Sequence, residues 1–200
     1  ILKFMTSKKA KVNTLAFFCL NLFNKNWLME FLKTSRKNLQ QIIKIIGEAQ
    51  EYLLIHNIDQ WQNGYPNEEA ILIDIINNES YIITTKESII IGTAMFSTKK
   101  EPTYKSIEGQ WITKSDAKYG VIHRMAVTNN FRKKGVAKFI FEKCEQQLRQ
   151  NEIMTMRIDT HEDNLAMQGL LLKLKYIYCG VICLENGDKR LAYEKCMSNL

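Results

Sequence analysis

The chain has 200 residues, 46% of them hydrophobic and 24% charged, which is the size and composition of one globular domain with a single core. The net charge of +7 points toward nucleic acid at first, but five lysines and no acid fall within residues 1–28, which leaves +2 for the remainder. No basic stripe follows on a predicted helix or strand, which argues against a nucleic-acid-binding domain.

The N-terminal segment resembles a secretory signal but lacks some of its parts. Lysines near residue 9 precede a short apolar run at residues 15–20. Asn21 interrupts this run, no small-residue cleavage site follows, and a spanning helix needs roughly 18 apolar residues. We therefore predict that residues 1–28 are a non-core extension, and that residues 29–196 form a domain without a membrane partner.

The five cysteines do not form a metal or disulfide pattern. Their number is odd, no CxxC pair occurs, and three scattered histidines accompany them. We expect no metal site and a reducing, cytoplasmic compartment. Cys179 and Cys183 lie four positions apart in an alternating apolar run, so we expect both to be buried on one strand face.

After residue 28, the apolar periodicity predicts alternating strands and helices. The predicted strands are 29–33, 81–85, 88–97, 120–127, 155–159, 176–183 and 189–195. The predicted helices begin at Thr34 or Ser35, after the N-cap Asn67, at Gly135 and at Asn164. The second and third strands, and also the last two, should pair as antiparallel hairpins. Residues 98–119 are too long for a simple connection and predict a partly ordered excursion near the functional site.

A short basic turn joins strand 120–127 to the helix that follows it. The segment reads Arg132-Lys133-Lys134-Gly135-Val136-Ala137. A helix N-terminus presents free N–H groups and a positive dipole, and glycine lets the backbone approach a ligand closely. The two commonest nucleotide loops, G-x-x-x-x-G-K-[ST] and G-x-G-x-x-G, are absent. The segment predicts an anion site, and a packing glycine among solvated cations is the alternative.

The same segment fits Arg-x-x-Gly-x-Ala, with Arg124-Met125-Ala126-Val127 before it and Asn164 after the next strand. Together these residues resemble the acetyl-CoA signature of the GNAT superfamily of N-acetyltransferases, and the resemblance extends from Met29 to about Cys196. It implies an α+β, three-layer α/β/α fold, in which a mixed, mostly antiparallel sheet of six to seven strands has helices on both faces. It implies acetyl-CoA as cosubstrate. The cofactor-binding residues by this resemblance are Met125, Ala126, Val127, Arg132, Lys133, Lys134, Gly135, Val136, Ala137 and Asn164.

The resemblance also implies direct transfer of the acetyl group to an amine, with the Met125 N–H polarising the thioester carbonyl. Because an alkylamine is mostly protonated near neutral pH, a general base is needed. His123, on the strand that carries the cofactor contacts, is the candidate, and simple packing in the strand is the alternative. Trp61 and His161 are candidate substrate contacts, although the residues around His161 can instead serve a turn and a helix cap.

Two positions depart from the family pattern. Leu171 stands where a tyrosine that protonates the leaving thiolate is often found, and Lys175 replaces a usual glycine. The leading hypothesis is an acyltransferase that acetylates a primary amine of a small molecule or peptide. A catalytically weak CoA-binding regulatory module is the alternative, and DNA binding through residues 1–28 is a third. A homodimer is an option, since the final hairpin can extend the sheet of a second copy.

Overall fold

The computed structural model of the chain describes residues 28–197. Apart from Leu28, the expected N-terminal extension lies outside the described residues, so the domain boundary stays a prediction. Within residues 28–197, no helix is both long enough and apolar enough to cross a membrane.

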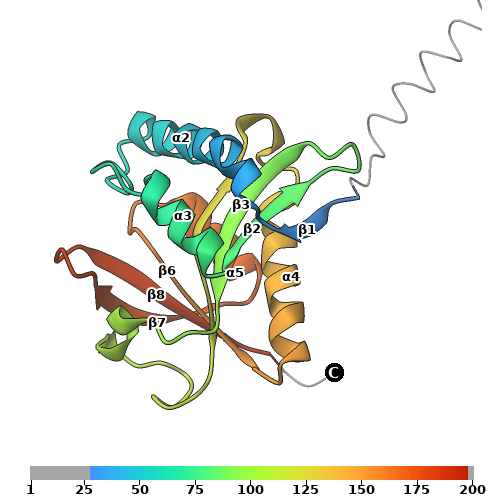
Figure 1. Cartoon of the computed structure of the whole chain (residues 1–200). Coiled ribbons are helices and arrows are strands. Elements are labelled where there is room, and N and C mark those ends of the chain that lie inside the picture. The colour runs from blue at the N-terminus through green and yellow to red at the C-terminus, as the bar shows by residue number, and fades with distance from the viewer. Residues whose placement is uncertain (1–27, 198–200) are drawn as a thin grey trace, which may run out of the picture.

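One eight-stranded sheet forms the centre of the fold, in the order β1-β2-β3-β5-β6-β8-β7-β4 (Figure 1). Its strands are β1 Glu30–Lys33, β2 Ser80–Thr84, β3 Ile90–Ser97, β4 Glu108–Gly109, β5 Gly120–Val127, β6 Thr155–Thr160, β7 Ile177–Cys183 and β8 Lys189–Cys196. Among the strands of residues 28–197, only β5 and β6 pair in parallel, which confirms a mixed, mostly antiparallel sheet. The strand beyond the expected six to seven is the two-residue β4, which pairs with β7.

The four predicted helices lie where periodicity places them, with one difference in where the first begins, and the 3₁₀ helices η2 and η3 were not predicted. Their bounds are η1 Arg36–Asn38, α2 Leu39–Ile55, α3 Glu68–Ile76, η2 Pro102–Lys105, η3 Asn129–Phe131, α4 Val136–Gln150 and α5 Leu165–Lys173. Ser35 precedes the short 3₁₀ turn η1, and the α-helix begins only at Leu39. Asn67 caps α3 as predicted, because its side chain accepts from the Ala70 N–H at 2.9 Å.

Two layers of helices cover the sheet, one on each face (Figure 1). Successive strand residues point to opposite faces, so Ile83 of β2 packs with α4 and α5 while its neighbour Ile82 packs with α2 and α3. Phe141 and Leu171 are fully buried in the first of these layers. The predicted three-layer arrangement is confirmed.

The excursion at residues 98–119 is anchored to the sheet by a buried charge pair. Arg157 of β6 and Glu194 of β8 are 2% and 0% exposed, and the Arg157 Nε donates to Glu194 Oε1 at 3.0 Å. The Arg157 guanidinium lies between the rings of Trp111 and Tyr119, 4.4 Å from each centroid. The excursion therefore packs over β7 and β8 and against Arg157 of β6.

The expectation for the two cysteines of β7 is half wrong. Cys179 is buried, but Cys183 is exposed. The register of β7 against β8 shifts between Tyr178 and Gly180, and such a bulge reverses the faces of all later residues. The bulge therefore turns Cys183 toward solvent.

The parallel pair at the centre of the sheet separates soon after it forms. Pairing between β5 and β6 is restricted to Gly120 with Met156 and Val121 with Arg157. Beyond these two pairs the strands diverge, and the sheet opens into a V (Figure 1). The two strands therefore have unpaired edges that face each other, in β5 from Ile122 onward and in β6 from Ile158 onward. The backbone N–H and C=O groups on these edges have no strand partner and can form hydrogen bonds with a ligand.

Candidate active site in the cleft between β5 and β6

A cleft of about 1130 Å³ lies where β5 and β6 diverge. Four of its basic side chains come from the turn before α4, from α4 and from α5: Arg132, Lys133, Lys138 and Lys173. Its carboxylates come from the α2–α3 loop, the excursion, β6 and the β7–β8 turn: Asp59, Glu101, Asp159 and Asp188. The basic side chains of α4 and α5 suit a phosphate-bearing ligand, and the carboxylates suit a cation.

Most of the predicted cofactor-binding residues line this cleft. They are Met125, Ala126, Val127, Arg132, Lys133, Gly135, Val136, Ala137 and Asn164. Gly135 is in the left-handed conformation at φ +85°, and a Cβ added there would meet no atom within 4 Å, so glycine is required by the backbone rather than by crowding. Lys134 does not line the cleft, and its ammonium lies 5.2 Å from the Phe131 ring centroid.

Two of these residues already have partners in the protein. The Arg132 guanidinium lies 3.9 Å from the Tyr52 ring centroid and donates to the Glu48 carbonyl at 3.2 Å. The Asn164 side chain caps α5 by accepting from the Met167 N–H at 3.1 Å, and it donates to Gln60 Oε1 at 3.0 Å. Binding a cofactor with either side chain would therefore exchange an existing contact for a new one.

A bulge in β5 lies directly before Met125. Thr93 of β3 pairs with Ala126, but Met95 pairs with His123, so one residue of β3 faces two of β5. Arg124 takes up the extra length at φ +49°, which is rare for a non-glycine residue. The bulge interrupts the ladder where the resemblance implies that the Met125 N–H is used.

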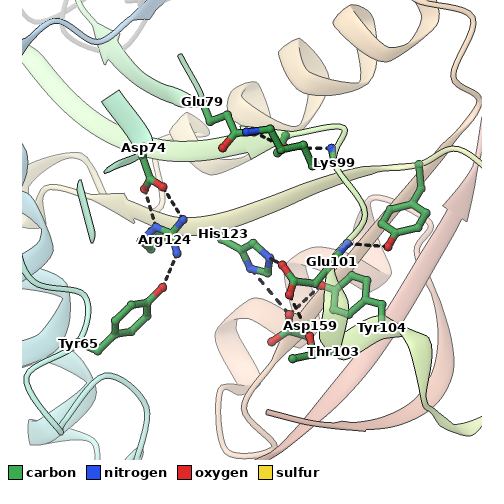
Figure 2. Close-up of polar contacts among 12 residues, drawn as sticks. Tyr65, Asp74, Glu79, Lys99, Glu101, Thr103, Tyr104, His123, Arg124 and Asp159 are labelled. Atoms are coloured by element: carbon green, nitrogen blue, oxygen red, sulfur yellow. Dashed lines mark hydrogen bonds and ion pairs between the residues drawn. The ribbon is translucent and has the colours of Figure 1, made fainter. Parts of the chain in front are cut away.

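The side chain of Arg124 holds this bulge to α3. Its Nε and Nη2 donate to the two carboxylate oxygens of Asp74 at 2.6 and 2.7 Å, and Nη1 donates to the Tyr65 hydroxyl (Figure 2). The side chains of Asp74 and Arg124 are 5% and 13% exposed, so the pair is largely desolvated. Tyr65, from the α2–α3 loop, lines the cleft.

His123 points into the cleft from the same strand, between two carboxylates (Figure 2). Its Nε2 lies 3.0 Å from Glu101 Oε2, and its Nδ1 lies 3.9 Å from Asp159 Oδ1. The hydrogen bond from His123 lowers the pKa of Glu101. Burial raises the pKa of the Tyr104 phenol, which therefore stays neutral and donates to Asp159 at 2.7 Å.

The two predicted substrate contacts differ in position. Trp61 lines the cleft, whereas His161 does not. The His161 Nδ1 accepts from the Asp163 N–H at 3.2 Å, within the turn before α5. This position fits the alternative that the residues around His161 serve the turn. Leu171, where the family tyrosine was expected, does not line the cleft either.

Several cleft residues were not predicted. Glu101, which lines the cleft, and Tyr104, which donates to Asp159 there, lie in the excursion, whose nearness to the site was expected but whose residues gave no signal. Asp159 could have been found, because it ends a central strand next to the turn that drew attention to His161. Lys138 and Lys173 each lie on a helix that was predicted, but neither belongs to the signature.

The sequence matches the model of the "Acetyltransferase (GNAT) family" over residues 49–176. A comparison with curated proteins gave no match. The fold is similar to that of a GNAT-family acetyltransferase from Streptococcus agalactiae, with 32% identity and a TM-score of 0.77, over 86% of this chain and 96% of that chain.

More distant structures share the fold. A GNAT-family acetyltransferase from Listeria monocytogenes has 15% identity and a TM-score of 0.67, over 84% of this chain and 95% of that chain. The NatC complex bound to a Gag peptide and CoA has 14% identity and a TM-score of 0.61, over 85% and 99%. The family match covers more than half of the sequence, and the streptococcal enzyme is over 30% identical across most of it. The chain therefore belongs to the GNAT family of acetyltransferases and is an acyltransferase.

Proposed function

We propose that this protein transfers an acetyl group from acetyl-CoA to a primary amine of a small molecule or peptide by direct attack. The observation that carries the proposal is the placement of His123, which faces a cleft whose α4 and α5 side has the cations that a phosphate-rich cosubstrate needs. Acetyl-CoA would supply the activated acetyl group, and the residues of this chain would bind, orient and move protons.

The cleft residues fit the cosubstrate. Lys133, Lys138 and Lys173 would neutralise its phosphates near the N-terminus of α4, where Gly135 leaves the backbone open. The free edge of β5 at Met125 to Val127 offers backbone groups to its pantetheine arm.

His123 would act as the general base. Because the Glu101 carboxylate accepts from Nε2, that nitrogen holds the proton of the neutral ring, and Nδ1 keeps a free lone pair. Asp159 Oδ1, 3.9 Å from Nδ1, is too far for a good hydrogen bond with it. A single ammonium group can donate to both atoms at once. Nδ1 would then remove the proton that makes the amine a nucleophile.

The Met125 N–H would stabilise the negative charge that develops on the acetyl oxygen, since the bulge in β5 frees this part of the backbone. No general acid is proposed at position 171. Leu171 is 0% exposed in the core, and a thiol of ordinary pKa near 8.5 can depart as the thiolate.

The test is thiol release from acetyl-CoA over a panel of primary amines. We expect turnover by the unaltered protein and a loss of about 10² to 10⁴ in kcat for His123→Ala, with CoA affinity retained in calorimetry. His161→Ala is the matched control, since that ring does not line the cleft.

The regulatory-module alternative rests on Leu171 and predicts the opposite result. CoA would bind, no amine would be acetylated, and His123→Ala would change nothing. If the unaltered protein acetylates an amine and His123→Ala has the same kcat, His123 is not the general base.

A further inference from the structure

We infer that the acceptor is a small diamine or polyamine, whose second ammonium group completes the charge balance around His123. This inference rests on the proposed function, because it assumes that the amine reacts in the cleft. It concerns two carboxylates of the cleft that no lysine or arginine of the chain neutralises.

The buried carboxylates elsewhere in the fold can be compared with these two. Four acidic residues of the described part of the chain are buried, and each is paired with its own lysine or arginine at 3.1 Å or less. The pairs are Asp74 with Arg124, Glu79 with Lys99, Glu145 with Lys195 and Glu194 with Arg157. The fold thus follows the rule that a desolvated carboxylate needs a cation beside it.

Glu101 and Asp159 depart from this rule. Their side chains are 24% and 11% exposed, and within residues 28–197 the basic group within 4.0 Å of either is His123, which they share. Even a protonated His123 leaves one negative charge between them, and the neutral ring that can accept a proton leaves two. Figure 2 shows the three side chains converging, whereas Arg124 points away from them toward Asp74.

The reacting amine enters as an ammonium ion and supplies one of these charges. A second ammonium on the same molecule supplies the other, so a dication balances the two carboxylates beside His123. An acceptor with a carboxylate in that place would add a third negative charge. The other arginines that line the carboxylate side do not change this balance, because Arg124 pairs with Asp74 and Arg190 with Asp188.

One further feature of the cleft, its aromatic lining, fits such a ligand. Trp61 and Tyr65 line it, and aromatic rings accept ammonium groups on their faces.

The experiment compares acceptors of equal length that differ at the far end. Propylamine is paired with 1,3-diaminopropane, and pentylamine with 1,5-diaminopentane and 5-aminopentanoate. We expect kcat/KM for at least one diamine to exceed that of its monoamine by about tenfold or more, and the aminopentanoate to be the slowest of its set. In Asp159→Asn this preference should fall to roughly threefold or less, whatever happens to the overall rate.

Asp163→Asn is the matched control, since it makes the same change on a side chain that is 62% exposed and outside the cleft lining, and it should keep the preference. Equal rates for the diamines and their monoamines, or an undiminished preference in Asp159→Asn, would overturn the inference and leave the proposed function standing. If none of the amines is acetylated, the proposed function fails. Calorimetry of the same amines with the CoA-bound protein then tests the inference separately. Tighter binding of a diamine than of its monoamine supports the inference, and equal binding overturns it.

Discussion

The hydrogen bond between Glu101 and His123 links the protonation of one carboxyl group to the stability of the domain. His123 holds the pKa of Glu101 below its ordinary value of 4.5. The ionised carboxylate therefore stabilises the folded state at every pH above that value, and the contribution is lost as the pH falls through the lowered pKa. We predict that Glu101→Gln reduces the free energy of unfolding by about 1 kcal/mol at pH 7, and by much less near pH 3.

Denaturant unfolding at the two pH values measures this difference. Glu108→Gln is the control, because Glu108 lies in the same excursion but its side chain is 67% exposed. That substitution should change stability little at either pH. A Glu101→Gln effect of equal size at pH 3 and pH 7 would show that packing, and not ionisation, accounts for it.

Single residues show where the sequence was informative and where it was not. His123 was proposed as a candidate because it shares a strand with the signature, but Glu101 was not, since only the folded excursion brings it to His123. Lys175 raised doubt about the turn after α5. The turn forms nonetheless, with Lys175 at φ +68° and the Tyr176 N–H donating to the Leu171 carbonyl at 2.9 Å. The helix cap therefore overrides the preference of lysine against this conformation.

At the scale of elements, the pairing of β5 with α3 through Arg124 and Asp74 positions the oxyanion donor proposed at Met125. We predict that Asp74→Asn destabilises the protein by about 2–4 kcal/mol, because it leaves a largely buried guanidinium without a counter-charge. It should also lower kcat by about tenfold or more with little change in the KM for acetyl-CoA, since the bulge loses its anchor and not its cofactor contacts.

Urea unfolding and steady-state kinetics measure the two effects. Glu142→Gln breaks the exposed ion pair with Lys138 on α4, where both side chains are more than half exposed, and should cost less than about 0.5 kcal/mol. A normal kcat in a folded but destabilised Asp74→Asn protein would mean that the ion pair serves stability alone.

The order of the elements could be predicted because each has a clear period and a clear boundary. The β5–α4–β6 unit is the best example, since its strand, glycine turn and helix were all placed within a residue or two. The bulge in β5, the bulge in β7 and the two-residue β4 could not be predicted. Each depends on register against a strand distant in sequence, which local periodicity does not contain.

At the scale of the whole molecule, the candidate active site is assembled by packing the excursion against β6 and β8. Glu194 accepts from the Thr113 N–H at 3.1 Å as well as from Arg157, and Trp111 Nε1 donates to the Tyr104 carbonyl at 3.0 Å. Tyr104 in turn donates to Asp159 in the cleft. Loosening the packing of the excursion at Trp111 should therefore affect Asp159 through Tyr104, although Trp111 itself does not line the cleft.

We predict that Trp111→Leu destabilises the protein by about 2–3 kcal/mol and lowers kcat, because Arg157 loses one of its two rings and Tyr104 loses a donor. Hydrogen exchange should accelerate in peptides from residues 98–119 and stay slow in α4 and β3, which belong to a separate core cluster. Ile112→Ala, at the neighbouring 48% exposed side chain, should change neither quantity appreciably. Uniform acceleration across the whole sheet would mean that the excursion and the central sheet unfold as one unit, and that the site has no separately stable support.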